Sequence, residues 1–224
     1  MVETLNLGMS VQQQPQEEII IFTRYPTPGK VKTRLIPKLG GQKAAHIHRL
    51  LTEQIIRSLL PLQQSRPVHV FLYYTGGSQK MMKNWLGGSL FLAEQKGKNL
   101  GQRMASAFKA AWARGIERAV IIGSDCPFIT DELLARALDL LGHNDAVLGP
   151  AYDGGYYLLG LNRSLPVAKF DLFFEDIAWG TPLVFQQTLE RAENVHLSVS
   201  TLTRLHDIDR PEDLEYFRHH TNAQ

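Results

Sequence analysis

The chain has 224 residues, of which 44% are hydrophobic and 21% are charged, and its net charge is +2. These values are typical of one large globular domain, and the molecule as a whole is not a polycation. The one cysteine, Cys126, excludes an internal disulfide and a thiolate metal cluster. No apolar run approaches the ~18 residues of a membrane span, and residues 1–18 carry no signal-peptide pattern. We therefore expect a cytoplasmic protein with no membrane partner.

Residues 1–18 are polar and rich in glutamine, so we expect a flexible tail there and a single domain over residues 19–224. Within this domain, short apolar runs alternate with longer segments of helical periodicity. The predicted strands cover 19–22, 68–74, 90–93, 119–122, 146–148, 156–159 and 195–199. The predicted helices lie near 42–60, 79–85, 100–114, 131–141, 181–193 and 211–219.

The alternation of strands and helices predicts an α/β fold, in which a largely parallel sheet is covered on both faces. After residue 146 the strands follow one another closely, and Asp153, Gly154 and Gly155 stand between two of them, which predicts a mixed sheet. Ligands of such sheets bind beyond the carboxyl ends of the strands. The residues that follow each strand are therefore the first candidates for function.

A basic loop follows the first predicted strand. Residues 19–52 include no acid but seven cations, and a glycine and two prolines predict a turn within the loop. Backbone N–H groups in such a turn can face an anion, and arginine side chains bind phosphate with two donors. A solvated surface that binds nucleic acid is the alternative; because the charge is local, we favour a discrete phosphate site. The predicted phosphate-binding residues are Arg24, Gly29, Lys30, Lys32 and Arg34.

Asp125 follows the buried strand predicted at 119–122. The next helix has its own N-cap in Thr130, so Asp125 is not needed as a cap. An acid at the carboxyl end of a strand, opposite a basic loop, suits a Mg²⁺ or Mn²⁺ ion that bridges to phosphate oxygens. The alternative is a turn aspartate that bonds its own backbone; we favour the metal.

Asp153 begins a turn of the kind that joins two antiparallel strands, because Asp-Gly is a strong hairpin signal. The glycines that follow Asp153 would also let a second substrate approach closely. Asp153 itself can act as a general base toward an acceptor hydroxyl. The spacing favours neither the hairpin alone nor the additional catalytic role.

Asp207 and Asp209 are two residues apart, so their side chains share a face if the segment is extended. A divalent cation would relieve their mutual repulsion, which makes both residues candidates for the metal site. Asp209 can instead cap the last helix, with Glu212 three residues further on. Asp207 is therefore the better candidate, and we interpret His206 as a surface residue.

The helix predicted at 100–114 begins with a capping box formed by Asn99 and Gln102. Capping explains these two residues sufficiently. Gly101 and Arg103, in the same turn, are additional candidates for lining a nucleotide pocket.

In this order, the motifs resemble those of the bacterial DUF2064 family, which includes proteins called rSAM/selenodomain-associated transferase 1. That family belongs to the GT-A, nucleotide-diphospho-sugar transferase fold group. The resemblance covers residues 19–217 and rests on five runs, at 28–35, 100–104, 123–127, 149–156 and 207–214. It implies a three-layer α/β/α sandwich with a mainly parallel mixed sheet, a nucleotide at the strand ends and a divalent metal at Asp125.

Three functions follow as hypotheses. The first is a metal-dependent glycosyltransferase that moves a sugar from a nucleotide diphosphate sugar to a small-molecule acceptor. In it Asp125, with Asp207 or Asp209, would hold Mg²⁺ or Mn²⁺ as a Lewis acid, and Asp153 would activate the acceptor. The second is a nucleotidyltransferase that uses a nucleoside triphosphate and releases pyrophosphate, which the dense basic loop favours. The third is a non-catalytic module that binds nucleotide or RNA.

Overall fold

The computed structural model describes residues 15–221, without the side chains of residues 218–221. Residues 1–14, most of the predicted tail, lie outside the described residues, as do residues 222–224. The described chain begins almost at once with a strand of the central sheet. Among its helices, none has both the length and the apolar character needed to cross a membrane.

The seven strands form one mixed sheet in the order β3-β2-β1-β4-β6-β5-β7. Strands β1 to β4 are mutually parallel, and β6 runs antiparallel to both β4 and β5. This arrangement confirms the predicted mixed α/β sheet. The strands are β1 (Glu17–Arg24), β2 (Val68–Thr75), β3 (Phe91–Glu94), β4 (Arg118–Gly123), β5 (Ala146–Pro150), β6 (Tyr156–Asn162) and β7 (Val199–Thr201).

Helices connect most of these strands. Two short 3-10 turns, η1 (Thr33–Leu35) and η2 (Asp171–Phe173), accompany them. The helices are α1 (Ile36–Leu39), α2 (Gly41–Ser58), α3 (Leu60–Ser65), α4 (Gln79–Leu86), α5 (Leu100–Ala113), α6 (Asp131–Leu140), α7 (Val167–Phe170), α8 (Val184–Asn194) and α9 (Pro211–Thr221).

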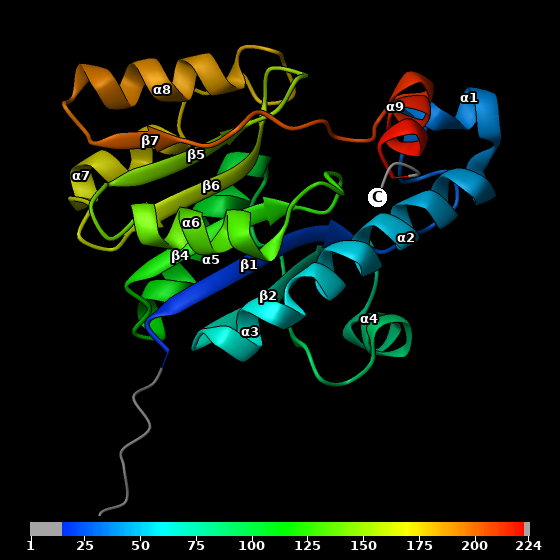
Figure 1. Ribbon diagram of the computed structural model, residues 1–224, viewed down its shortest axis with the longest axis horizontal. Coiled ribbons are helices and arrows are strands. Elements are labelled where there is room, and N and C mark those ends of the chain that lie inside the picture. The colour runs from blue at the N-terminus through cyan, green and yellow to red at the C-terminus, as the bar shows by residue number, and fades with distance from the viewer. Residues whose placement is uncertain (1–14, 222–224) are drawn as a thin grey trace, which may run out of the picture.

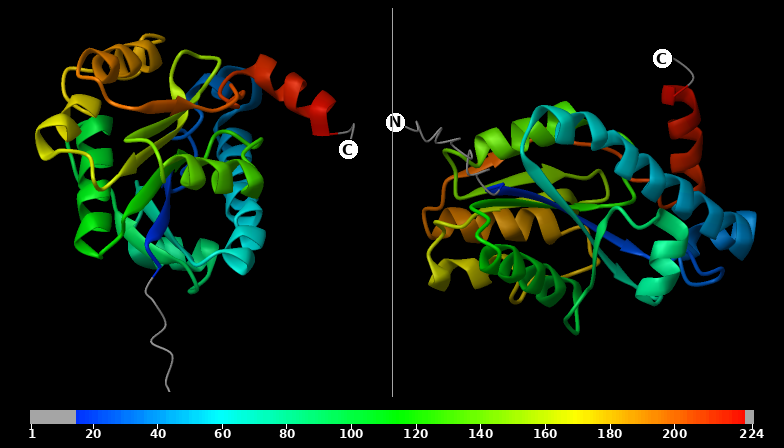
Figure 2. Two further views of the ribbon diagram at one scale, coloured as in Figure 1. Left: turned by 60° about the vertical axis from the view of Figure 1, so that its left-hand side comes forward. Right: turned by 90° about the horizontal axis from the view of Figure 1, so that it is seen from below.

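Both faces of the sheet are covered, which makes three layers (Figures 1 and 2). Side chains alternate between the two faces of a strand, so Ile19 and Ile21 enter one core while Ile20 enters the other. The first core includes Ile55 from α2 and residues of α3 and α6. The second includes Phe108 from α5 and residues of α7 and α8. The two cores together explain why the central strands are apolar on both faces.

Several predicted boundaries differ from the structure. The helix expected over 42–60 is α2, which ends at Ser58, two residues before the predicted end. A separate helix, α3, begins at Leu60 with a proline in its first turn, where proline is well tolerated. The strand expected over 195–199 is wrong except at its last residue, because α8 continues to Asn194 and a turn with a left-handed His196 follows. The strand itself is Val199–Thr201.

The first strand begins at Glu17, so the last two residues of the predicted tail belong to the sheet. Glu17 and Glu18 are buried at this end of β1. Glu17 pairs with Arg66 and Arg118, and Glu18 pairs with Arg114, whose NH2 lies 2.6 Å from Glu18 Oε1. Buried carboxylates need such partners, and these partners come from distant parts of the chain.

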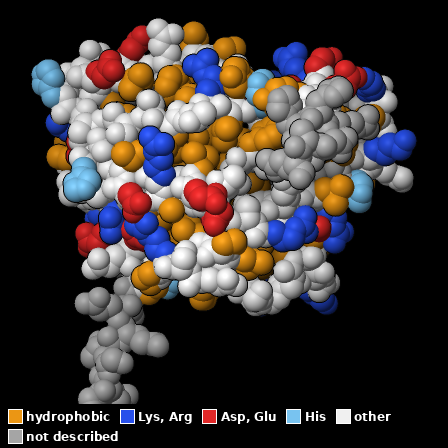
Figure 3. Space-filling model, viewed as in Figure 1, with side chains coloured by type: hydrophobic (Ala, Val, Ile, Leu, Met, Phe, Trp, Pro, Cys, Tyr) orange, Lys and Arg blue, Asp and Glu red, His pale blue; other side chains and the backbone are white. Residues whose placement is uncertain are grey.

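Charged side chains of both signs are interspersed over the face of the molecule shown in Figure 3. The C-terminal helix α9 lies beside α1 (Figure 1), with Lys38 Nζ 3.5 Å from Glu215 Oε1. The basic segment that contains α1 therefore faces an acidic helix on one side. Its charge is local rather than spread over a broad surface.

We predict that Arg114→Ala lowers the free energy of unfolding by about 3 kcal/mol at neutral pH, because it leaves the fully buried Glu18 without its partner. Burial already raises the pKa of Glu18, against the opposing effect of Arg114. The folded variant therefore holds a proton on Glu18 to higher pH than the unfolded chain, and its stability should rise as the pH falls. Urea denaturation at neutral and mildly acidic pH measures both effects.

The matched control is the double variant Glu18→Gln, Arg114→Met, which removes both charges and should recover part of the lost stability. If Arg114→Ala lowers the free energy of unfolding equally at both pH values, the loss of stability does not come from Glu18.

Candidate active site

The register of the sheet brings the basic loop and Asp125 to the same edge. Strands β1 and β4 are parallel neighbours, and Phe22 pairs with Gly123. Two residues beyond that pair, Arg24 and Asp125 stand at the carboxyl ends of their strands. Both carboxyl ends lie at the edge where ligands of such sheets bind, so the two predicted parts of the site lie together.

The loop after β1 is held by its own backbone and by Arg24. Lys30 N donates to Thr27 O at 3.0 Å, and Arg24 NH1 donates to Lys30 O at 3.1 Å. Gly29 has φ +81°, a left-handed conformation that glycine adopts without a steric cost. Gly29 does not line the nearby cavity, so its contribution is the shape of the turn.

A basic cavity of about 350 Å³ opens between this loop and the end of β4. Four of the five residues predicted to bind phosphate line it, together with Asp125, Asp209 and the unpredicted His48. The exposed side chain of Lys30 lies at its rim. Several cations around one small cavity suit a polyphosphate. The lining residues are Arg24, Lys30, Val31, Lys32, Thr33, Arg34, His48, Asp125 and Asp209.

Lys32 differs from the other cations of this cavity. Its side chain is only 2% exposed, and its ammonium lies 2.7 Å from Asp125 Oδ1 and 3.4 Å from Asp209 Oδ1. It also donates to the carbonyl oxygen of Ile208. The sequence predicts Lys32 as a phosphate ligand; in the structure its ammonium is bound by two carboxylates and a carbonyl.

His48 is a part of the site that the sequence analysis missed. Its Nε2 lies 2.9 Å from Arg24 O, and its Nδ1 lies 3.7 Å from Asp125 Oδ1. Burial acts to raise the pKa of Asp125, but the charge of Lys32 and then the contact with His48 outweigh it and hold that pKa below its usual value. The only sequence signal for His48 is its place in a helix that follows the basic loop.

The cap of the last helix is not Asp209. Asp213 Oδ2 accepts hydrogen bonds from the N–H groups of Asp209 and Arg210, at 2.9 and 2.6 Å. The carboxylate of Asp209 is therefore available, and its Oδ2 lies 2.7 Å from Arg34 NH1. Ile208 N donates to Asp125 O at 2.8 Å, which ties this segment to the end of β4.

A second cavity, of about 710 Å³, adjoins the first and shares Arg34, Asp125 and Asp209 with it. Asp153 and Asp207 also line this second cavity. Burial raises the pKa of Asp207 to about 6, and the charges of Asp153 and Asp209 add to the shift. The second cavity therefore has an acidic part, in contrast to the basic first cavity.

The Asp-Gly-Gly turn forms one wall of the second cavity. Asp153 Oδ1 accepts a hydrogen bond of 2.8 Å from Gly155 N. Gly154 has φ +88°, and a side chain there would lie 2.2 Å from the carbonyl oxygen of Pro182. Gly154 thus allows the backbone around Pro182 to approach the turn closely.

Gly101 and Arg103 line neither cavity. A side chain at Gly101 would lie within 2.7 Å of Phe174 and Trp179 atoms, so this glycine is needed for close packing. Arg103 Nε donates to Gly97 O at 3.1 Å. The structure therefore shows a local structural role for both residues, and their predicted contact with a nucleotide stays a prediction.

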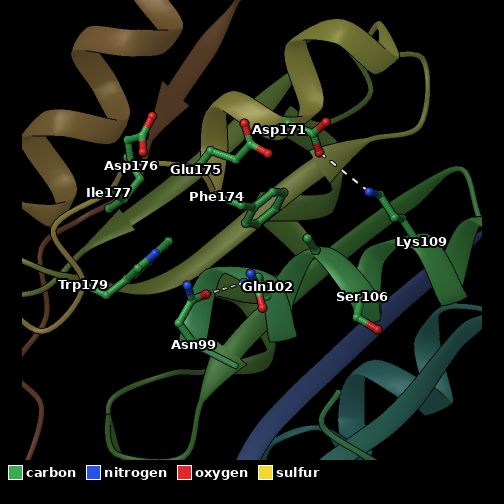
Figure 4. Close-up of a pocket in the computed structure, with 11 residues that line it drawn as sticks. Asn99, Gln102, Ser106, Lys109, Asp171, Phe174, Glu175, Asp176, Ile177 and Trp179 are labelled. Carbon is green, nitrogen blue, oxygen red and sulfur yellow. Dashed lines mark hydrogen bonds and ion pairs between the residues drawn. The ribbon is translucent and has the colours of Figure 1, made fainter. Parts of the chain in front are cut away.

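A further cavity, of about 730 Å³, lies on the other side of Trp179, between α5 and the segment around η2 (Figure 4). Its wall carries Asp171, Glu175 and Asp176, and Lys109 Nζ lies 3.6 Å from Asp171 Oδ1. Because acids outnumber cations there, this cavity is unsuited to a phosphate. We therefore place the candidate active site at the junction of the other two cavities.

The expected divalent metal does not fit the arrangement of Asp125 and Asp209. Their Oδ1 atoms both contact the ammonium of Lys32, so a cation between them would meet a positive charge. Across the part of the chain that the structure describes, no three His, Cys, Asp or Glu side chains are grouped so as to hold a metal ion. Mg²⁺ and Mn²⁺ prefer several oxygen ligands, which this pair alone does not supply.

The fold is that of nucleotide-diphospho-sugar transferases and nucleotidyltransferases. The chain is similar to a protein from Desulfovibrio desulfuricans G20, described provisionally as a nucleotide-diphospho-sugar transferase, with 36% identity and a TM-score of 0.80 over 88% of this chain and 83% of that one. It shares the fold of 4-diphosphocytidyl-2C-methyl-D-erythritol synthase from Anaerococcus prevotii DSM 20548, with 12% identity and a TM-score of 0.60 over 92% and 97% of the chains. It also shares the fold of CMP:2-keto-3-deoxy-manno-octonic acid synthetase complexed with CTP, with 10% identity and a TM-score of 0.57 over 93% of this chain and 99% of that one.

Residues 59–181, more than half of the chain, match the family described as "Uncharacterized protein conserved in bacteria (DUF2064)". The chain belongs to this family, as the order of its motifs predicts. Comparison with curated proteins finds no match.

We predict that Cys126, which lines the second cavity, is not a reactive nucleophile. Its side chain is buried, and burial raises the pKa of the thiol to about 12. Because the thiolate is the reactive form, alkylation by iodoacetamide at mildly alkaline pH should be slower by about a hundredfold or more in the folded protein than in denaturant. Mass spectrometry of timed samples measures both rates, and similar rates would contradict the assignment.

Proposed function

We propose that the protein is a nucleotide-utilising transferase that moves a sugar from a nucleotide diphosphate sugar to a small acceptor. The observation that carries this proposal is the junction of a basic cavity and a partly acidic cavity at Asp125. A diphosphate suits the first cavity, and a sugar with a hydroxyl acceptor suits the larger second one. The description of the Desulfovibrio protein, at 36% identity, supports the same class.

The basic cavity would hold the leaving diphosphate. Arg24 holds the loop in place by donating a hydrogen bond to the carbonyl oxygen of Lys30. The ammonium of Lys30, at the end of an exposed side chain, would contact the phosphate. Arg34 reaches both cavities, so its guanidinium would lie near the bond that breaks. Positive groups placed in advance around a developing negative charge stabilise the transition state.

The second cavity would hold the acceptor, with Asp153 and Asp207 as the candidates for a general base. A base is most effective when its pKa is near the working pH, and the pKa of Asp207 is raised to about 6, by burial first and by Asp153 next. We therefore propose that Asp207 takes the proton of the acceptor hydroxyl and that the charge of Asp153 helps to raise the pKa of Asp207. Asp153, the base expected from the sequence, remains the alternative.

Nucleotidyl transfer is the second candidate function. It is favoured by the number of cations around the basic cavity, since a triphosphate carries more negative charge than a diphosphate. The shared fold with a synthetase complexed with CTP agrees with this possibility at the level of fold only. A non-catalytic RNA-binding role has less support, because charges of both signs are interspersed on the face in Figure 3.

We predict that a nucleotide diphosphate sugar raises the melting temperature of the protein, since ligand at ~100 times its Kd stabilises a fold by about 2.7 kcal/mol. A thermal-shift screen of nucleotide sugars and nucleoside triphosphates identifies the base and the phosphate chain. Analysis of products then separates the two reactions, because sugar transfer releases a nucleoside diphosphate and nucleotidyl transfer releases pyrophosphate. Stabilisation by triphosphates alone, with pyrophosphate release, would overturn sugar transfer.

We predict that Lys30→Ala weakens binding of the stabilising nucleotide by about tenfold, the effect of losing one charge-assisted hydrogen bond. Its melting temperature without ligand should stay unchanged, because the Lys30 side chain is exposed. The matched control is Lys43→Ala, an exposed lysine of the same basic segment that does not line the cavity. Equal weakening in both variants, measured by calorimetry, would indicate a diffuse basic surface instead of a phosphate site.

A further inference from the structure

The backbone at Lys32 is unusual for a lysine. Its φ is 48° and its ψ is 44°, in the left-handed region that residues with a side chain rarely adopt. Glycine adopts this conformation without strain. Keeping a lysine here requires a compensating interaction, and the side chain supplies it.

Three oxygen atoms lie close to the Lys32 ammonium, two of them as hydrogen-bond acceptors and one, from Asp125, as an ion-pair partner. These atoms are Oδ1 of Asp125 at 2.7 Å, Oδ1 of Asp209 at 3.4 Å and the carbonyl oxygen of Ile208. An ammonium group has three donors and no acceptor, so the environment of Lys32 matches its capacity. With 2% exposure of the side chain, the charge of Lys32 is balanced by these three oxygen atoms together.

The acceptors come from two neighbouring segments that both contact the loop. Asp125 follows β4, whereas Ile208 and Asp209 precede α9, and the two segments are tied together by the hydrogen bond from Ile208 N to Asp125 O. Arg34 binds the outer oxygen of Asp209 at 2.7 Å. The carboxylate pair is therefore already neutralised by Lys32 and Arg34.

We propose that Lys32 is the resident cation of the Asp125–Asp209 pair and takes the place of a divalent metal ion there. A metal ion between the two carboxylates would lie within a few ångström of the ammonium, and like charges at that distance repel strongly. The pair therefore binds no divalent ion while Lys32 is present. Removal of the lysine leaves the two carboxylates and the carbonyl oxygen of Ile208 around an empty position, which is the start of a site for a hard cation.

A consequence for ligand binding rests on the proposed function. Because Lys32 and Arg34 neutralise the carboxylates, Lys30 remains available to a phosphate in the basic cavity. Binding of the nucleotide to the wild-type protein then needs no metal on this pair. Occupation of the pair by Lys32 does not depend on which nucleotide, if any, binds.

Titration with Mn²⁺, followed by the loss of its free electron-paramagnetic-resonance signal, tests the inference without any nucleotide. Wild-type protein should bind no Mn²⁺ in the micromolar range. Lys32→Gly, which suits the left-handed backbone, should bind one ion at least tenfold more tightly than wild type. The double variant Lys32→Gly, Asp125→Asn is the matched control, and it should lose that ion.

A wild-type protein that binds one Mn²⁺ ion, and loses it in Asp125→Asn or Asp209→Asn, would overturn the inference. So would a folded Lys32→Gly variant, checked by circular dichroism, that gains no ion. The wild-type titration decides the matter even where the variant does not fold. If instead no nucleotide stabilises the protein, the proposed function fails while the Mn²⁺ result still stands.

Once a stabilising nucleotide is identified, its thermal shift should be the same with EDTA and with Mg²⁺ in the wild-type protein. In Lys32→Gly the shift should become dependent on the divalent ion. A wild-type shift that disappears in EDTA and is lost equally in Asp209→Asn would contradict the assignment of Lys32 as the cation of this pair.

Discussion

The contact between the Lys32 ammonium and the Asp125 carboxylate joins the parts of the site that the sheet brings to one edge. Lys32 comes from the loop after β1, Asp125 from the end of β4, and Asp209 from the segment before α9. The parallel register of β1 and β4 sets the loop of Lys32 and Asp125 at one edge of the sheet. The hydrogen bond from Ile208 N to Asp125 O brings the segment of Asp209 to the same place. Buried charges are costly without partners, so this contact constrains all three segments together.

Much of the fold could be predicted because its signals are local. The three isoleucines of β1 face both cores, which is what a continuous apolar run in a parallel sheet predicts. Thr130 and Asn99 accept the capping hydrogen bonds expected of them, at 3.2 and 2.8 Å. Since Thr130 caps α6, Asp125 is available for the site, as the spacing predicts.

What could not be predicted depends on contacts between distant residues. Asp209 has a sequence context that suits a helix cap, yet α9 begins at Pro211, the side chain of Asp213 binds the N–H groups of Asp209 and Arg210, and Asp209 binds Arg34. His48 carries no motif, and only the tertiary structure sets it beside Asp125. Glu18 belongs to a polar segment by composition, but its partner Arg114 lies almost a hundred residues away. Patterns along the chain do not contain these pairings.

The division of charge between the two cavities has a chemical consequence. Under the proposed function, a group that leaves as a phosphate anion would be stabilised on the basic side, and a hydroxyl that must lose a proton would be assisted on the side of Asp153 and Asp207. Asp125 and Arg34 belong to both cavities, so the bond between leaving group and transferred group should lie next to them. The same division explains why a fixed lysine suits this site: together with Arg34 it balances the charge of the shared carboxylates, which would otherwise repel a phosphate.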